Sequence, residues 1–342
     1  MKELFRIYWL AALLTLSIWI AVLIWGGGPA ALWTVIVLTL LEITFSADNA
    51  VVNSKVLVTM SQFWQKLFMT VGIFIAVFVM RFFMPLVIVM MTAGLGLTEV
   101  VHLALNDAHT YEKHLHEAEP LINAFGGTFL LMIALSYFID YEKKTHWFAF
   151  LEKRLGKLGV LDNVTVFVML VAAVVLYATM PHEHQSAVLL ASIVAVLVHV
   201  GLNLLNSAFT HSQKGVLSLK KKVGWAAFSA FLYLEILDAS FSLDGVIGAF
   251  AITSSVVLIM AGLGAGAVWV RAMTIHLVRA QTLSKYVYLE SGAHWAIGFL
   301  GSVMLLKLYH IEPPEWLIGG LGLGLIGAAM WWSKHVHTPV KK

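Results

Sequence analysis

The sequence predicts an all-α, polytopic membrane bundle of about ten transmembrane helices, arranged as a 5+5 inverted-topology repeat. Three observations lead to this fold class: an apolar composition, ten apolar runs of membrane length, and an acidic motif that recurs five spans later. Hydrophobic residues make up 60% of the 342 residues and charged residues only 12%, whereas a soluble domain carries roughly 25% charge. The mean hydropathy is +0.86. We therefore expect residues 1–342 to form a single transmembrane domain.

The elements follow from the length of the apolar runs, because a hydrocarbon core about 30 Å thick needs roughly 20 apolar residues per helix. Such runs lie at about residues 7–25, 30–53, 67–96, 121–139, 164–180, 186–208, 224–252, 256–275, 290–308 and 315–332. The first run follows Lys2 and Arg6, as in a signal peptide, but it lacks a clear small-residue cleavage site before Gly26. We expect it to be a retained helix.

The basic residues test this helix count, since ten helices place both termini on one side of the membrane. That side receives 18 of the 22 Lys and Arg residues, the opposite side receives Lys113 and Lys307, and Arg81 and Arg271 fall inside predicted helices. The positive-inside rule makes the first side cytoplasmic. This predicts an N-in, C-in protein of the plasma membrane, of the bacterial inner-membrane type.

Composition also excludes some partners and chemistries. A net charge of +3 is too small to indicate binding to nucleic acid. The chain has no Cys, which removes disulfides, thiolate metal sites and Cys nucleophiles.

An internal repeat divides the chain into repeat one, about residues 7–180, and repeat two, about residues 186–332. Residues 42–49 (EITFSADN) and 238–245 (DASFSLDG) share the pattern acid-x-x-Phe-Ser-x-Asp. The next span of each half carries a Gly followed nine residues later by an Arg, as Gly72 with Arg81 and Gly262 with Arg271. Because the matched spans are five apart, they cross the membrane in opposite directions. Inverted repeats of this kind place substrate sites near the bilayer midplane, which predicts transport.

Five acidic residues and two arginines fall within the predicted spans. The acids are Glu42, Asp48, Glu235, Asp238 and Asp244. An excess of three negative charges in low dielectric must be protonated, paired or bound to a cation. Two interpretations stay open at this point: Arg–carboxylate bridges that tie the halves together, or a cation site.

Helical spacing places most of these polar residues on two stripes. At 100° per residue, one stripe holds Glu42, Ser46 and Asn49. The other holds Glu235, Asp238, Ser242 and Gly245. We expect the stripes to face each other across the repeat axis. Asp48 and Asp244 lie about 120° away from these stripes around the helix axis. They can reach the stripes only if the Phe-Ser-x-Asp segments unwind or bend.

Carboxylates, a carboxamide and hydroxyls form a hard-oxygen site suited to Mg²⁺, Ca²⁺ or Mn²⁺. The expected metal ligands are Glu42, Asp48, Asn49, Glu235, Asp238 and Asp244, supported by Ser46, Ser242, Arg81 and Arg271. The metal is expected as cargo, with no tightly bound cofactor.

A His- and acid-rich outer loop at residues 98–119 is the second candidate metal site. Its His109, His114 and His116 would collect divalent metal at the mouth of a pathway. The alternative is a solvated amphipathic segment without a ligand.

Residues 45–52 (FSADNAVV) and 237–244 (LDASFSLD), with the arginines that follow, resemble the paired signatures of the TerC family of integral membrane proteins, including its branch with a longer second signature and an unknown-function label. The resemblance covers roughly residues 30–332. It implies a link to tellurium resistance and manganese export, and ion ligands at Glu42, Asp48, Asp238 and Asp244. Glu235 and the His-rich loop depart from the family pattern, which leaves the identity of the metal open.

The resulting hypothesis is a secondary transporter, not an enzyme, that exports Mn²⁺ or, second, Ca²⁺ through a carboxylate site, coupled to protons. A homo-oligomer is compatible with this reading. One alternative is a membrane scaffold for stress and tellurium-resistance proteins that uses the basic loops 141–163 and 209–223. Another is an intramembrane aspartyl hydrolase that uses Asp48 and Asp244.

Overall fold

The computed structural model describes residues 2–25, 27–161, 163–182, 184–211 and 221–335. Within these ranges the chain forms helices and no β-strand, and each of the ten predicted apolar runs is helical. Eight of the described helices are long and apolar enough to cross a membrane. The prediction of an all-α polytopic membrane bundle is therefore confirmed. Of the basic loop 209–223, residues 212–220 lie outside the described part of the chain.

The helices have the following bounds: α1 Lys2–Trp25, α2 Gly28–Phe45, α3 Ala47–Leu57, α4 Gln62–Phe74, the π-helix η1 Ile75–Phe83, α5 Met84–Ala93, α6 Leu97–Asn106, α7 Ala108–Glu117, α8 Glu119–Phe138, α9 Ala149–Leu158, α10 Val164–Thr179, α11 Gln185–His211, α12 Gly224–Phe250, α13 Val256–Arg279, α14 Thr282–Lys285, α15 Leu289–Lys307 and α16 Glu315–His335.

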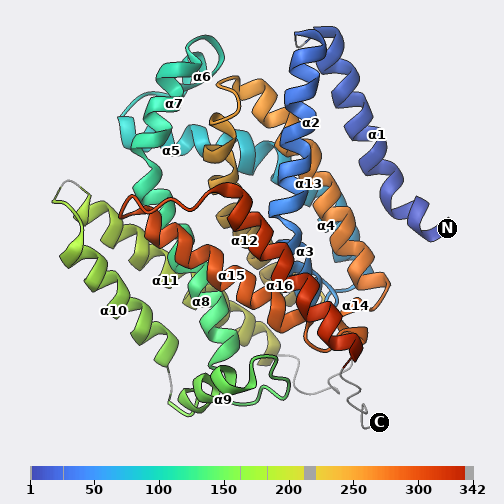
Figure 1. Cartoon of the computed structure of the whole chain (residues 1–342), viewed down its shortest axis with the longest axis vertical. Helices are drawn as coiled ribbons and strands as arrows, with labels where there is room; N and C mark the ends of the chain where they lie inside the picture. Colours follow the sequence, from blue (N-terminus) through green and yellow to red (C-terminus); the bar gives the residue numbers. More distant parts are fainter. Residues whose placement is uncertain (1, 26, 162, 183, 212–220, 336–342) are drawn as a thin grey trace.

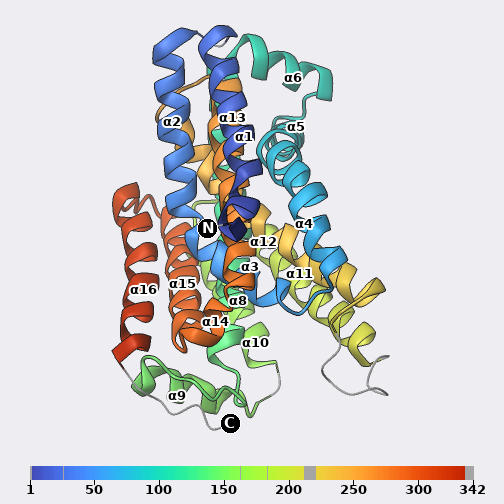
Figure 2. The ribbon, with the colours of Figure 1, turned by 90° about the vertical axis from the view of Figure 1, so that its right-hand side faces the viewer.

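The long helices slant from upper left to lower right in Figure 1, which gives the bundle two ends. The α1–α2, α10–α11 and α15–α16 connections lie at one end together with α6 and α7, and we call this end the α6–α7 side. Helices α9 and α14 and the C-terminal end of α16 lie at the other end, the α9 side (Figures 1 and 2), and Figure 1 shows the N-terminal end of α1 at this end of the slanted helices. Both described chain ends therefore lie on the same side of the bundle.

Helix α12 lies at the centre, because its side chains enter each of three hydrophobic clusters. Val246 and Ile247 pack with α5, α6 and α7. Leu237 and Phe241 pack with α8 and α15, and Leu234 packs with α1, α4 and α13. The second acidic motif therefore lies on the helix that contacts most of the bundle.

Small residues in α13 allow α2 to approach closely. A Cβ atom added to Gly262 would overlap the Leu38 side chain and lie 3.2 Å from the Val35 carbonyl oxygen. A Cβ atom on Gly266 would lie 2.5 Å from Glu42 Cβ. Small residues are the usual means of bringing membrane helices into backbone contact. The contact holds the first acidic motif against repeat two.

The first predicted motif span is interrupted, and the second is continuous. Ser46, at φ −100° and ψ 15°, separates α2 from α3. Its amide still donates to the Glu42 carbonyl, and its carbonyl accepts from Ala50. The chain therefore bends at Ser46 without losing these bonds, whereas α12 stays helical through Phe241 and Ser242. Of the two Phe-Ser-x-Asp segments, the first is therefore bent and the second is not.

The expected outer loop at residues 98–119 is folded, which corrects that part of the prediction. It forms the helices α6 and α7, and the side chains of Tyr111 and Leu115 are buried. Asp107 caps α7, accepting hydrogen bonds from the Thr110 amide (3.3 Å) and hydroxyl (2.7 Å), and these bonds lower its pKa. The cap is therefore present at neutral pH and weakens as acidification protonates Asp107.

We predict that Gly262→Ala destabilises the protein by roughly 1–3 kcal/mol, because the added methyl group overlaps Leu38. Thermal unfolding in detergent would measure the loss. Gly201→Ala in α11 is the matched control, since a Cβ atom there meets nothing within 4 Å, and helix propensity favours Ala by roughly 0.5–1 kcal/mol. Equal melting temperatures for the two variants would contradict the close α2–α13 contact.

Candidate functional site

Two buried arginines pair with carboxylates inside the bundle. Arg81 of η1 hydrogen-bonds to Glu42 of α2. Arg271 of α13 contacts Glu235 at 2.8 and 3.0 Å and Asp238 at 3.3 Å, both on α12. All five side chains are at least nine-tenths buried. Each carboxylate bridge joins helices of the same repeat, so the expectation that such bridges tie the two halves together is wrong.

The structure also shows how each arginine is held. Arg81 Nη1 donates to the Ala76 carbonyl at 2.6 Å, within the wide turn of η1. Short π-helical segments are frequent at functional sites. Arg271 Nη1 donates to the Phe68 carbonyl at 3.3 Å, and its guanidinium lies 4.2 Å from the centre of the Phe68 ring. Arg271 thereby contacts α4 of repeat one as well as its own repeat.

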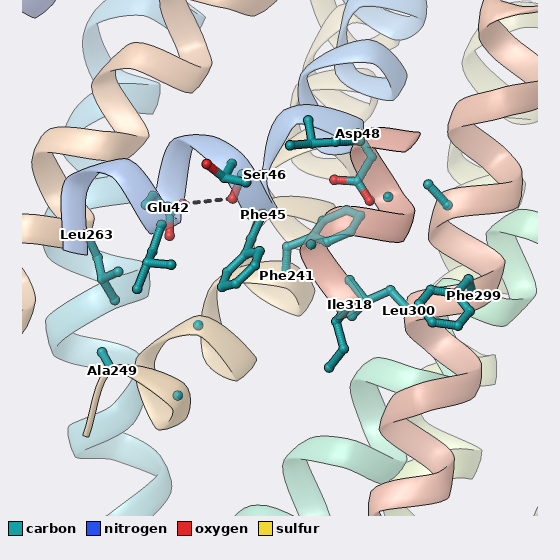
Figure 3. A pocket seen from close by; sticks show the side chains of 18 of the residues that line it. Glu42, Phe45, Ser46, Asp48, Phe241, Ala249, Leu263, Phe299, Leu300 and Ile318 are labelled. Carbon is teal, nitrogen blue, oxygen red and sulfur yellow. Dashed lines mark hydrogen bonds between the residues drawn. The ribbon is translucent and has the colours of Figure 1, made fainter. Parts of the chain in front are cut away.

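The two polar stripes meet between the repeats. Asn49 Nδ2 donates to Asp238 Oδ1 at 3.0 Å, across 189 residues of sequence. A Cβ atom on Gly245 would lie 3.6 Å from Glu42 Oε2. On the first stripe, the Ser46 hydroxyl donates to Glu42 Oε1 at 2.9 Å (Figure 3). The structure therefore brings together Glu42, Ser46 and Asn49 with Asp238 and Gly245.

A cavity of about 910 Å³, including its open mouth, lies next to these stripes. Its walls come from α2, α12, α13, α15 and α16, and Asp48 lies at the first turn of α3. The lining residues are Leu38, Leu41, Glu42, Thr44, Phe45, Ser46, Asp48, Phe241, Gly245, Gly248, Ala249, Leu263, Ala296, Phe299, Leu300, Lys307, Ile318, Gly319, Gly322 and Leu323. They come mostly from the parts of their helices nearer the α6–α7 side.

Asp48 lines this cavity, and its carboxylate points into it (Figure 3). The side chain is 5% exposed, and Oδ1 accepts a hydrogen bond from the Asn49 amide at 2.9 Å. Among the described side chains, no Lys, Arg or His forms an ion pair with it. Asp48 thus differs from Glu42, Glu235 and Asp238, which all contact an arginine.

Several buried oxygen atoms around the motifs lack hydrogen-bond partners. They are Asn49 Oδ1, Asn53 Oδ1 and Ser242 Oγ. Buried polar atoms are normally paired, and each exception needs a physical reason. Carboxamide and hydroxyl oxygens are acceptors that a hard cation binds. Of these three atoms, Asn49 Oδ1 belongs to the residue that directly follows Asp48.

The predicted set of six metal ligands is divided in this structure. Among the described residues, no three His, Asp or Glu side chains converge on a common point where a metal could bind. Glu42 and Glu235 face arginines, whereas Asn49 and Asp238 contact each other. The side chain of Asp244 lies outside the described residues.

The histidines of α7 do not form a metal cluster either. His114 pairs with Glu117 at 3.0 Å, and His116 pairs with Glu119 at 3.4 Å. His109 is exposed one turn earlier. Metal capture by His109, His114 and His116 therefore stays a prediction.

Sequence reasoning missed the contribution of α15 and α16. Phe299 and Leu300 of α15 line the cavity, and Phe45 of the first motif packs against Gly319 of α16 so closely that a Cβ atom there would overlap the ring. The available signal was the run of glycines from Gly319 to Gly327. From the sequence alone, this run indicates no more than part of an apolar span.

The fold and site define an all-helical membrane protein with a polar centre between two sequence repeats and a cavity that leads to it. A family model described as a protein of unknown function (DUF475) matches residues 47–338. The chain belongs to this family. No curated protein and no solved structure matches the chain.

The two arginines lead to a prediction about stability. Glu42→Gln removes the carboxylate that Arg81 contacts in the described structure, whereas Glu235→Gln leaves Arg271 with Asp238. An arginine left without its buried counter-charge costs roughly 3–5 kcal/mol. We expect Glu42→Gln to lower the unfolding free energy by about that amount and Glu235→Gln by clearly less, measured by denaturation in mild detergent. The reverse order would contradict this assignment of partners.

Proposed function

We propose that this protein is a secondary transporter that exports a hard divalent cation, with Mn²⁺ as the first candidate and Ca²⁺ as the second. The observation that carries the proposal is Asp48, a buried carboxylate that lines a cavity without a described ion pair, next to a bend in the helix. A charge in this position within a membrane bundle is costly and marks a functional site. The Oδ1 atom of Asn49, the next residue, has no hydrogen-bond partner, and an oxygen ligand supports a hard cation over a soft one.

The packing around the site supports alternating access. On the α9 side of Asp48, every residue from 47 to 54 is buried. The Asn49–Asp238–Arg271 contacts and the Lys55–Glu290 pair between α3 and α15 lie on that side. The cavity-lining residues of α12, α13, α15 and α16 come from the parts of these helices nearer the α6–α7 side. From this we infer a conformation that is open toward the α6–α7 side and closed toward the α9 side.

The distribution of charge supports the orientation of the protein in the membrane. The α9 side carries the basic connections that the positive-inside rule assigns to the cytoplasm, so the cavity would face outward. Export itself and the preference for Mn²⁺ rest on the resemblance to the TerC family. Tellurite is a poor candidate for direct transport because it is an anion and the site is rich in carboxylates.

Export of a divalent cation needs a driving force. Moving two positive charges out against an inside-negative potential of 100 mV costs roughly 4.6 kcal/mol. Asp48 is a carboxylate that no arginine holds in the described structure, so it is suited to exchange a metal ion for a proton. Antiport with protons is therefore the mechanism we propose.

We predict that Asp48→Asn abolishes Mn²⁺ uptake into inverted membrane vesicles that carry a proton gradient. The amide cannot supply the negative charge or release a proton. Glu99→Gln on exposed α6 is the matched control and should transport like the wild type. Each variant is first checked for a monodisperse elution profile in detergent.

The outcomes separate the alternatives. Gradient-dependent uptake by wild type and Glu99→Gln, lost in Asp48→Asn, supports the proposal. Wild-type uptake that Asp48→Asn retains would contradict the role of Asp48. The absence of Mn²⁺ and Ca²⁺ flux in well-folded wild type would contradict transport of these cations and favour the scaffold reading.

The Lys55–Glu290 pair gives a second prediction, because it joins α3 to α15 on the closed side. We expect Lys55→Glu to open this side by placing two carboxylates together. Since the chain has no Cys, a Ser54→Cys reporter, at a fully buried position, can be labelled with an impermeant maleimide in inverted vesicles. Labelling should rise severalfold in Lys55→Glu and return toward the starting rate in Lys55→Glu/Glu290→Lys. Unchanged labelling in Lys55→Glu would contradict the closing role of the pair.

A further inference from the structure

Helix α9 is fixed across the end of the bundle by a buried carboxylate. Glu152 is fully buried and accepts hydrogen bonds from Lys143 Nζ (2.8 Å), Trp295 Nε1 (2.9 Å), and the amides of Trp147 (3.1 Å) and Phe148 (3.2 Å). These bonds tie α9 and the segment before it to α15. The orientation of α9 is therefore set by the protein fold.

The end of α9 is held equally closely. A Cβ atom on Gly159 would overlap the Ile139 carbonyl at the end of α8. Glu152 and Gly156 form the buried face of the helix. None of the hydrophobic clusters formed by the described residues includes a residue from the opposite face of α9.

This outward face combines apolar and basic side chains. We define the α9 face as Phe150, Lys153, Arg154, Lys157 and Leu158, together with the following Val160 and Leu161. Phe150 is 73% exposed, Val160 66% and Leu161 63%, and the three basic side chains are also exposed. The Arg154 guanidinium lies 3.9 Å from the centre of the Phe150 ring. Basic and apolar side chains on one exposed face are typical of helices that lie in a membrane interface.

The connection to α10 places this face near the membrane surface. Val164–Thr179 is an apolar helix of 16 residues, which span about 24 Å at 1.5 Å per residue, close to the hydrocarbon core of about 30 Å. In the sequence, the polar residues Asp162 and Asn163 separate Leu161 from this helix. Val160 and Leu161 therefore come within four residues of the end of an apolar helix of nearly membrane length, as expected for a segment at the boundary between headgroups and acyl chains.

We propose that the α9 face binds the anionic headgroup region of the adjacent membrane leaflet. Phe150, Leu158, Val160 and Leu161 enter the boundary of the acyl chains, and Lys153, Arg154 and Lys157 contact lipid phosphates. A basic side chain near an anionic surface strengthens binding roughly fivefold. The proposal concerns the lipid surface and stands whether or not the protein transports a cation.

The experiment uses the full chain, into which single cysteines can be introduced because it has none. Phe150→Cys and, separately, Leu158→Cys are labelled with bimane and reconstituted into vesicles of phosphatidylcholine alone or with 30% phosphatidylglycerol. Quenching is measured with a headgroup-level nitroxide lipid and with aqueous iodide. Glu142→Cys, an exposed position outside the α9 face, is the matched control.

We expect nitroxide to quench both α9 labels several times more than iodide does, with the difference larger in anionic vesicles. The Glu142 label should show the opposite preference. Combining Lys153→Gln, Arg154→Gln and Lys157→Gln with either reporter should remove the extra effect of phosphatidylglycerol. Iodide quenching equal to that at Glu142 in both vesicles would overturn the proposal, and nitroxide quenching that does not depend on anionic lipid would overturn its electrostatic part.

Discussion

The constraint on which this structure depends is the cost of burying charge in a membrane. The guanidinium groups of Arg81 and Arg271 form ion pairs that stabilise the buried carboxylates of Glu42, Glu235 and Asp238. Their positions in turn require close helix contacts: a Cβ atom on Gly72 would overlap Arg271, and one on Gly266 would overlap Glu42. The packing of α2, α4, α12 and α13 is thus organised around two guanidinium groups. Among the described acids of the two motif regions, Asp48 is the one that contacts neither arginine.

The two halves share a motif but differ in structure, and the difference has a physical consequence. Ser46 interrupts the first motif, so that Asp48 begins α3 and its carboxylate reaches the cavity, whereas the second motif continues as one helix. In the proposed transport cycle, this difference between the halves would make the site accessible from one side at a time. The bend at Ser46 brings Asp48 to the cavity.

Much of the fold could be predicted from the sequence, because membrane helices must satisfy their own backbone hydrogen bonds and so appear as long apolar runs. Helical spacing also predicts that Asn49 and Asp238 lie on stripes that face each other, and the two side chains are in contact. The partners of the acids could not be predicted, since they depend on which helices pack together. Glu42 meets Arg81 and Glu235 meets Arg271 only because η1 and α13 lie where they do. Likewise, Phe299 and Gly319 carry no charge or motif that would have linked them to the site.

Charge balance at the centre limits how the proposed transport cycle can work. Among the described acids of the two motif regions, Glu42, Glu235 and Asp238 contact Arg81 or Arg271, and Asp48 does not. Asp48 is adjacent to Asn49, which contacts Asp238, and Asp238 shares Arg271 with Glu235. In the proposed cycle, a cation at Asp48 would compete with Asn49 and Arg271 for Asp238, and the Asn49–Asp238 contact would be the point at which the two repeats respond to the ion together.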